Sequence, residues 1–576
     1  MGTALHPLTG AARRACALRV APYIAWIVFL APVVCGVVAT LMPAFGFLPT
    51  LGGARLSLAP WRDLAQTPGI DRSIALTLFT GFGATIVALC LAMATCAWLQ
   101  RGALGTNVGR LLAPLLATPH SAMALGFAFA IAPSGWIVRM LSPWLTGWNV
   151  PPDVALVGDS WGLALIAALV LKETPYLILM TIGALHQVDA QQHLRMARSM
   201  GYGRVESWIK TVLPLVYPQI RLPVLAVLAF SLSIVDVALI VGPDQPPPLA
   251  VIAVRDFADP RLDGFFTGAA ASCAQLAIVA LALLAWRAGE RVVAAWGRGW
   301  IARGRRATLA TPLAGFAVGL GAIVVALSVL SLAALACWSL AAQWRYPDAL
   351  PVQWTLANWM RLSRDAVSLA STTAGIAVCA TALAIAIALA CLENEDVSGV
   401  HTTSRSAWLL YTPLLVPQIV FLFGAQALLV ATGYDGTLAA VVWAHLVFVL
   451  PYVFLSLAHP WRALDRRYAR TAASLGASPA RIFWRVKLSL LLPPLLIAGA
   501  VGFAVSVGLY LPTLFAGGGR IDTLTLAAVT LASGADRRTI GVYAGLQALL
   551  PCIAYMLALA ISVWSHARRS DPPAWL

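Results

Sequence analysis

Long uninterrupted apolar runs are the feature that most restricts how this chain can fold. About 20 consecutive apolar residues cross a bilayer as an α-helix. About twelve such runs occur, at roughly 20–41, 74–99, 111–132, 161–185, 214–241, 264–286, 312–342, 366–392, 407–432, 437–459, 489–515 and 541–565. Only 11% of the 576 residues are charged, against about 25% in soluble domains. The runs are too long and too uniformly apolar for barrel strands. We therefore expect an all-α polytopic membrane protein of about twelve transmembrane helices.

The formal charge of +16 comes mainly from short loops between the apolar runs, such as 186–213, 287–311 and 460–488. Basic residues gather in cytoplasmic loops, so these loops and both termini are expected in the cytoplasm. We expect a multi-pass membrane protein, with 20–41 as an uncleaved first span. The loop 393–406 disagrees, because it is acidic, but acids weigh little in this rule. No nucleic-acid-binding motif accompanies the basic charge.

The two halves of the chain carry the same features at a nearly constant spacing. Gly201 and Gly476 lie 275 residues apart, and Pro119 and Pro417 lie 298 apart. Both halves start on the same side, so we expect two parallel six-helix repeats with a path between them. The predicted parts are a cytoplasmic N-terminus, a first half, a basic cytoplasmic linker, a second half and a cytoplasmic C-terminus, at 1–19, 20–286, 287–311, 312–565 and 566–576.

One cytoplasmic loop recurs in both halves, as "ARSMGYGRVESWIKTVLPLVYP" and "AASLGASPARIFWRVKLSLLLPP". In the first copy Asp189 can cap a helix, Gly201 can end it in a left-handed turn, and a second short helix leads to a span that begins near Pro214. A single loop of this kind could be an amphipathic connector on the headgroups. Two copies at one position of a repeat favour a docking element.

The two loops resemble the EAA loops of ABC importer permeases of type I, whose pattern is E-A-A-x-x-x-G, an aromatic residue, and L-P-x-x-x-P. The matching residues are Ala197, Gly201, Trp208, Leu213, Pro214 and Pro218, and in the second copy Ala472, Gly476, Phe483, Leu488 and Pro493. Two loops in one chain resemble the fused permeases of thiamine and ferric-iron importers. The stretches "LVLKETPYLIL" and "PSGWIVRMLSPWLTGW" resemble the YnjC-like branch in particular.

This resemblance implies partners. In that family the loop is a coupling helix seated in a groove of a cytoplasmic ATPase, and a solute-binding protein outside delivers a small-molecule substrate. The implied ATPase-coupling residues here are Arg195, Ala197, Gly201, Trp208, Arg470, Ala472, Gly476 and Phe483. Arg195 and Arg470 stand where the family has an acid, which predicts an acidic groove in the partner. No G-x-x-x-x-G-K-[ST] motif occurs, so ATP would be bound by a separate ATPase, in two copies. The resemblance further implies a bacterial inner (plasma) membrane, with 20–286 as permease half 1 and 312–565 as permease half 2. We expect no enzyme activity, catalytic residue or cofactor in this chain.

Polar residues inside the spans are candidates for the translocation path: His120, Lys172, Glu173 and Asp236. Charges at these positions are costly. Lys172 and Glu173 are adjacent, so they point about 100° apart and at least one should meet a cavity or another helix. A structural bridge near Pro175 is the alternative to a substrate contact, and an intramembrane His is most often a satisfied interhelical hydrogen bond.

Other classes of protein fit less well. A twelve-span ion-coupled secondary transporter also has two parallel halves, but it would not need paired glycine-hinged loops. A membrane enzyme would show a reactive constellation, and none stands out. The nine cysteines contain no C-x-x-C, and no His/Cys/Asp cluster has metal-ligand spacing.

Overall fold

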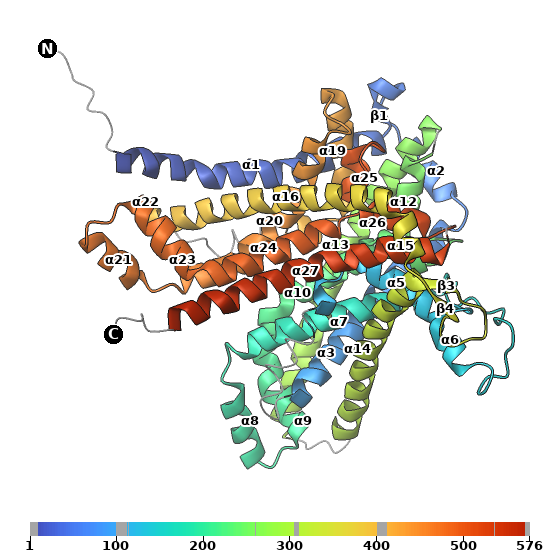
Figure 1. Ribbon diagram of the computed structural model, residues 1–576, viewed down its shortest axis with the longest axis horizontal. Helices are drawn as coiled ribbons and strands as arrows, with labels where there is room; N and C mark the ends of the chain where they lie inside the picture. The colour runs from blue at the N-terminus through green and yellow to red at the C-terminus, as the bar shows by residue number, and fades with distance from the viewer. Residues whose placement is uncertain are drawn as a thin grey trace.

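The computed structural model describes residues 10–99, 112, 114–259, 261–304, 310–399, 412–534 and 536–570. Within these residues the chain is almost entirely helical (Figure 1). Two short hairpins interrupt it: β1 (Phe47–Leu48) pairs with β2 (Gly53–Ala54), and β3 (Ala341–Gln343) pairs with β4 (Gln353–Trp354). Ten helices of the described part are long and apolar enough to cross a membrane, or eleven if one bent pair counts as a span. The all-α polytopic membrane fold is confirmed.

The first half runs from the first span to the long helix after the outer loops. Its helices are α1 (Gly10–Ala44), α2 (Ala59–Gln66), α3 (Ile70–Leu99), α5 (His120–Ile131), α6 (Trp136–Leu141), α7 (Leu163–Leu185), α8 (Ala190–Ser199), α9 (Arg204–Ser207), the π-helix η2 (Trp208–Val212), α10 (Leu213–Ser233), α11 (Asp236–Val241), α12 (Leu249–Phe257) and α13 (Leu262–Ala302), with the 3-10 turn η1 (Pro49–Leu51) between β1 and β2.

The second half repeats this order. Its helices are α14 (Ala310–Leu340), α15 (Ala357–Arg361), α16 (Ser363–Ser398), α18 (Thr412–Leu415), α19 (Gln418–Thr432), α20 (Leu438–Arg462), α21 (Arg466–Ser474), α22 (Pro479–Arg481), the π-helix η3 (Ile482–Lys487), α23 (Leu488–Leu490), α24 (Leu492–Val507), α25 (Leu511–Gly517), α26 (Leu524–Leu531) and α27 (Arg537–Ser570).

Some predicted span boundaries are wrong. The predicted span 214–241 breaks at 234–235, between α10 and α11. The predicted span 489–515 breaks twice: at Leu491, where the chain bends by 75° between α23 and α24, and at 508–510, between α24 and α25. The predicted span 264–286 is too short, because α13 continues to Ala302 through most of the predicted linker. The third and ninth predicted spans begin among residues that the structure does not describe. In the second of these, the described helix α19 is short for a span.

The repeat holds at the level of single hydrogen bonds. The hydroxyl of Thr77 on α3 accepts the backbone N–H of Leu249 at 3.0 Å, and the hydroxyl of Thr373 on α16 accepts that of Leu524 at 3.0 Å. Each bond satisfies an N–H at the free N-terminus of a short helix, α12 or α26. The two halves therefore hold these helices in the same way.

The first helix of each half packs against the opposite half. α1 lies along α19 and α16, whereas α14 lies along α5 and α3. At the first crossing a Cβ on Gly36 or Gly424 would overlap backbone of the facing helix, and at the second a Cβ on Gly126 would overlap the carbonyl group of Ser331. Small residues let helix backbones approach closely in a membrane, so the halves interlock through their first helices.

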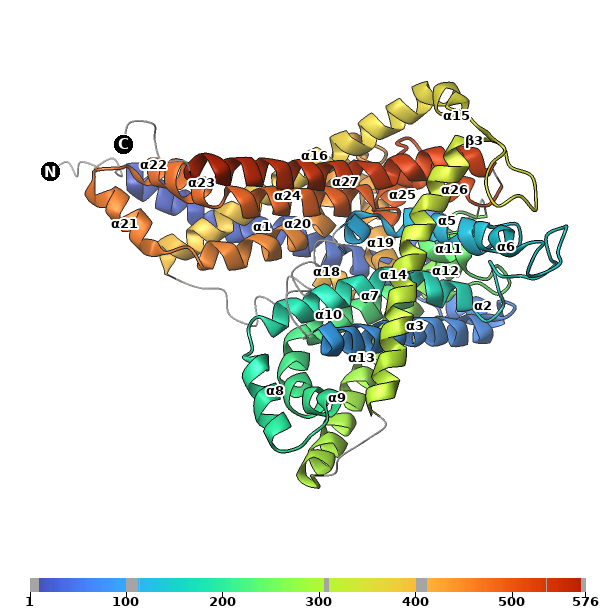
Figure 2. The ribbon, with the colours of Figure 1, turned by 60° about the horizontal axis from the view of Figure 1, so that its bottom comes forward.

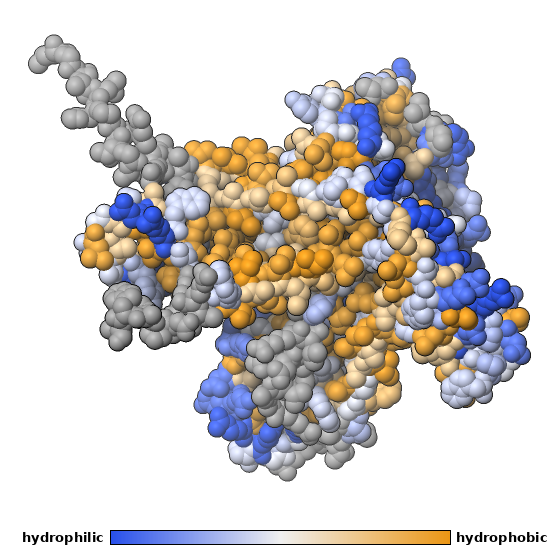
Figure 3. Space-filling view, viewed as in Figure 1, coloured by the Kyte–Doolittle hydropathy of each residue, from blue (hydrophilic) through white to orange (hydrophobic). Residues whose placement is uncertain are grey.

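The helices form two arms that diverge from a common end, which carries α2, α6, α12 and α15 (Figures 1 and 2). One arm ends at α8 and α9 and the other at α21 and α22, and the views agree that these two tips lie well apart. Apolar side chains cover the visible length of the arms, while hydrophilic side chains gather at the tips and at the common end (Figure 3). This distribution matches a bilayer around the middle of the arms.

A buried arginine ties the halves together at the common end. The guanidinium of Arg139 on α6 donates to the carbonyl oxygens of Ser134 at 2.8 Å and Arg345 at 2.7 Å. It also lies over the rings of Trp344 and Tyr346, 5.0 and 5.5 Å from their centroids. The stretch "PSGWIVRMLSPWLTGW" of the first half is therefore anchored on the β3–β4 connection of the second.

Candidate functional site: two coupling segments and an intramembrane polar cluster

The first repeated loop, residues 189–212, forms a helical hairpin whose turns are set by single residues; we name it the first coupling segment. The carboxylate of Asp189 caps α8 by accepting the backbone N–H of Gln192 at 3.4 Å. Gly201 follows with φ of 82°, a left-handed conformation that glycine adopts without strain. The predicted cap and glycine turn are confirmed.

The second coupling segment, residues 465–487, repeats this backbone. Asp465 caps α21 by accepting the N–H of Arg467 at 2.9 Å, and Gly476 has φ of 80°. The side chain of Ser478 then caps α22 by accepting the N–H of Arg481 at 3.3 Å. The turn chemistry is thus local and duplicated.

Both segments return to the membrane through a π-helical turn, which the sequence did not reveal. The N–H of Leu213 bonds to the carbonyl oxygen of Trp208, and that of Leu488 bonds to Phe483. The expectation that a separate span begins near Pro214 is wrong, because α9, η2 and α10 run on as one helix of 30 residues. Pro214 has no N–H that could donate the next bond of the π-helical turn. The turn η2 therefore ends at Val212, just before Leu213 and Pro214.

The first coupling segment is seated on its own half by apolar packing. Ala197 is 0% and Trp208 2% exposed, and both pack inward, whereas Arg195 is exposed. Trp208 therefore packs within its own half. Beneath it, the Lys210 ammonium bonds to the carboxylate of Glu206 at 2.9 Å and lies over the ring of Trp300 at 4.3 Å.

The second coupling segment is much more open. No side chain of α21 is buried, Arg470 is exposed and Ala472 is half-buried. Phe483 is half-buried, with its ring centroid 6.2 Å from that of Trp461. Leu475 is 82% exposed, so this tip presents apolar surface beside its basic side chains.

Sequence reasoning missed the acidic end of α16 as part of this site. Glu393 and Asp396 bond to Lys487, and Glu395 bonds to Arg462, at the two ends of the second coupling segment. The signal was visible: these acids are the ones that made the loop 393–406 disagree with the charge rule. They are acidic because they neutralise the neighbouring basic loop.

The four polar residues predicted inside the membrane do not act alike. The Lys172 ammonium donates to the carbonyl oxygens of Leu115 at 2.9 Å and Leu116 at 2.8 Å, and also to that of Thr118. It thereby satisfies three carbonyls at the end of a helical segment. Glu173 instead faces His120, with 3.2 Å between Oε1 and Nε2. The expectation that at least one of the two adjacent charges meets another helix is confirmed, since His120 lies on α5.

His120 and Asp236 lie where the halves meet. The His120 ring centroid is 4.7 Å from that of Phe230, and a Cβ on Gly508 of the second half would lie 3.5 Å from the ring of Pro119. Asp236 begins α11, directly after the break in the fifth span. The second half has Phe448 and Val449, both buried, at the positions matching Lys172 and Glu173, so the polar cluster belongs to the first half.

No group of three or more His, Cys, Asp or Glu side chains close enough to hold a metal ion occurs in the described part of the chain. His445 is fully engaged: its ring nitrogens lie 2.8 Å from the Ser506 hydroxyl and 2.9 Å from that of Thr513. It links α20 to both sides of the α24–α25 break.

Two parallel, interlocked halves, each carrying one glycine-hinged coupling segment, are the features of the membrane-spanning permease of an ABC importer. The comparisons with known proteins agree, and the chain belongs to the inner-membrane ABC transporter permeases. It is 32% identical over 530 residues to the inner membrane ABC transporter permease protein YnjC of Escherichia coli (strain K12), covering 91% of this chain and 94% of that one.

Other permeases match a smaller part of the chain. The molybdenum transport system permease protein ModB of Mycobacterium tuberculosis is 37% identical over 134 residues, covering 20% of this chain and 50% of ModB. The putative 2-aminoethylphosphonate transport system permease protein PhnV of Salmonella typhimurium is 28% identical over 240 residues, covering 40% of this chain and 87% of PhnV. No protein-family model matches the chain. The alternative of an ion-coupled secondary transporter is not favoured.

Proposed function

We propose that this permease carries a small solute received from an extracytoplasmic binding protein, and that each coupling segment docks on one of two copies of a cytoplasmic ATPase. The supporting observation is the duplicated backbone of the two segments, each with a capped helix, a left-handed glycine and a π-turn. Each segment ends one of the two arms (Figure 2). Two identical ATPase subunits require two equivalent attachment points, and this arrangement supplies them.

Within each segment, the exposed residues would contact the ATPase and the buried ones would position them. Arg195 and Arg470 belong to the first group, Ala197 and Trp208 to the second, and the half-buried Ala472 lies between the two. Gly201 and Gly476 shape the turns, and Phe483 supports the second segment against Trp461. Because two arginines replace the acids of the family pattern, we infer an acidic groove on the ATPase.

The topology follows from the same proposal. The start of α1 and the end of α27 lie beside α22 and α23 (Figure 1), so the termini and both coupling segments face the cytoplasm together. The predicted division into 20–286 and 312–565 remains our proposal for the two functional halves, with α13 extending the first of them to Ala302. ATP is bound by the ATPase, and this chain supplies the path.

Charge reversal tests the docking. Arg470→Glu in the full-length, affinity-tagged chain should reduce the ATPase recovered with it from membranes of the native host, and Arg195→Glu should do the same. The matched control is Arg364→Glu, an exposed arginine at the opposite end of α16. Full recovery of the ATPase with both arginine variants would refute the proposed contact.

For the translocation path we propose Glu173, His120 and Asp236, and assign Lys172 a positioning role because its ammonium is held by three carbonyls. Glu173→Gln keeps the shape of the side chain and removes its charge. It should abolish the ability of the gene to complement a deletion strain while leaving the amount of chain in the membrane unchanged. Normal complementation by this variant would contradict a role for Glu173 in transport.

A further inference from the structure

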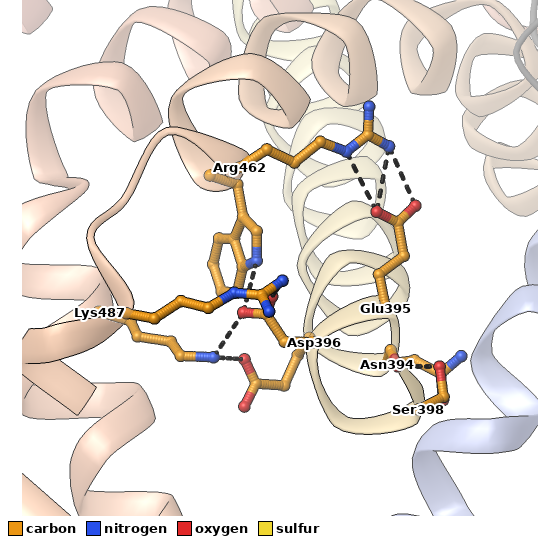
Figure 4. A network of polar contacts seen from close by, with 9 residues as sticks. Asn394, Glu395, Asp396, Ser398, Arg462 and Lys487 are labelled. Atoms are coloured by element: carbon orange, nitrogen blue, oxygen red, sulfur yellow. Dashed lines mark hydrogen bonds and ion pairs between the residues drawn. The ribbon is translucent and has the colours of Figure 1, made fainter. Parts of the chain in front are cut away.

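The C-terminal end of α16 holds both ends of the second coupling segment (Figure 4). The carboxylate of Glu395 accepts bonds from Arg462, at 3.2 Å from Nε and 3.1 Å from Nη2. The Lys487 ammonium donates to Glu393 at 2.6 Å and to Asp396 at 2.8 Å. Arg462 lies three residues before the segment and Lys487 is its last residue. The end of α16 therefore forms ion pairs at both ends of the second coupling segment.

These contacts are partly shielded from water. The side chain of Glu395 is 8% exposed and that of Lys487 is 10% exposed. The indole N–H of Trp461 donates to Asp396 at 3.2 Å, and its ring covers the ammonium of Lys487 at 5.2 Å. Shielded pairs are less screened by salt than surface pairs, and removing one member leaves the other charge uncompensated.

Little else holds α21 in place. It buries no side chain, whereas α8 of the first coupling segment buries Ala190, Leu194 and Ala197. Thr77 and Thr373 are equivalent positions of the two halves, 296 residues apart, and the same offset makes Ala97 the equivalent of Glu393. Ala97 belongs to the apolar core that also contains Ala190 and Leu194 of α8. The first coupling segment is thus seated mainly by apolar contact, whereas the second combines the contact of Phe483 with Trp461 and the ion pairs to α16.

We propose that Glu393, Glu395 and Asp396 form an ionic clamp that positions the second coupling segment and carries its displacement into α16. This inference rests on the proposed coupling function. α16 packs directly on α1, α20 and α24, so a pull on the clamp reaches the first span of the chain as well as the second half. The matching residues of the first half, Ala97, Leu99 and Gln100, are not acidic, and the displacement of the first coupling segment passes through the packing of α8 on α9 and η2. The two segments therefore transmit force by different means.

Hydrogen exchange of the full chain in lipid nanodiscs tests the clamp without any partner. In the Glu393→Gln/Asp396→Asn variant, amides of 466–487 should exchange about tenfold faster than in the wild type, because Lys487 loses both carboxylates. Amides of 190–212 should be unchanged and serve as the internal control. Asp435→Asn, which removes a second-half acid bonded to Arg520 at 3.1 Å, controls for loss of an acid–arginine pair elsewhere. Equal exchange of 466–487 in variant and wild type would overturn the proposal.

A second measurement separates positioning from folding. Complexes with the ATPase are purified from the native host, and their ATPase rate is measured per assembled complex. Glu395→Arg should lower kcat severalfold with KM for ATP unchanged, because nucleotide binds in the partner, and adding Arg462→Glu should restore kcat by rebuilding the pair with reversed charges. Failure of the double variant to regain activity would count against the clamp. A wild-type chain that recovers no ATPase would contradict the proposed function, and the exchange comparison would then decide the clamp by itself.

Discussion

The crossing of α1 and α19 allows the interlock of the two halves to be tested with one methyl group. In Gly424→Ala the new Cβ would overlap the carbonyl oxygen of Gly36 and lie 2.8 Å from both its carbonyl carbon and the Thr40 hydroxyl oxygen. Ordinary carbon contacts lie near 3.5–4.0 Å, so the helices must separate by about 1 Å, which forfeits about a quarter to a half of the dispersion energy at the crossing.

The size of the effect follows from three contributions. Overpacking of this kind costs about 1–3 kcal/mol. Separation also disrupts the hydrogen bond from the Thr40 hydroxyl to the carbonyl oxygen of Val420, which adds about 1 kcal/mol. The higher helix propensity of Ala than of Gly stabilises the variant by about 1 kcal/mol. The net loss in the free energy of unfolding is about 1–3 kcal/mol.

Thermal unfolding of the purified full chain, followed by fluorescence-detected size exclusion, measures this loss. A change of 1 kcal/mol shifts Tm by about 2–4 °C in a cooperative unit of 150–250 residues, so Tm should fall by at least about 2 °C. Gly375→Ala is the control, because a Cβ there meets nothing within 4 Å on the same kind of helix. A Gly424→Ala variant as stable as this control would show that α1 is not tightly packed on the second half.

Three further outcomes are expected. Replacing Arg139 by Met removes two charge-assisted hydrogen bonds, to the carbonyls of Ser134 and Arg345, which should cost about 2–4 kcal/mol. The two carbonyls keep only the weaker donors Arg537 and the N–H of Asp348. Lys should not restore stability, since one ammonium cannot reproduce the fork of donors, and a wild-type melting curve for either variant would contradict this. In Gly476→Ala the new Cβ would meet no atom within 4 Å, but the backbone has a φ of 80°. Backbone strain alone should therefore destabilise α21–η3 by about 1 kcal/mol, which amide exchange of 466–487 would show as faster exchange. The control Gly289→Ala, at a helical glycine, should not change this exchange. Burial raises the pKa of Asp256, on the short helix α12, to about 6. Because the folded-state pKa lies above the usual value of 3.8, the stability that Asp256 contributes when protonated is lost as pH rises from about 4 through about 6. Asp256→Asn should therefore melt higher than wild type at pH 8 and equally at pH 4, and a pH-independent difference would refute this origin.

Features encoded by neighbouring residues could be predicted from the sequence. Asp189 and Gly201 flank the ten-residue helix α8. Asp189 caps its first turn and Gly201 ends it, and both effects act on the local backbone alone. The echo of this pattern at Asp465 and Gly476 identified the repeat, and the uniform apolar runs identified the membrane. Each of these signals is contained in a window of a few turns.

Features that depend on residues far apart could not be predicted. Lys487 and Glu393 are separated by 94 residues and Gln547 and Ser121 by 426, and no local pattern indicates such pairs. The role of Lys172 was open for the same reason, since its partners lie on another segment. The breaks at 234–235 and 508–510 were hidden because apolar residues continue through them.

The interlock of the first helices also sets an order of events during synthesis. Thr40 on α1 bonds to Val420, 380 residues later in the chain. At about 5–20 residues per second, the ribosome needs about 20–75 s to make that partner after α1 has entered the bilayer. During this interval α1 must remain in the lipid with Gly36 not yet covered by α19. The second half then packs onto a helix that is already inserted.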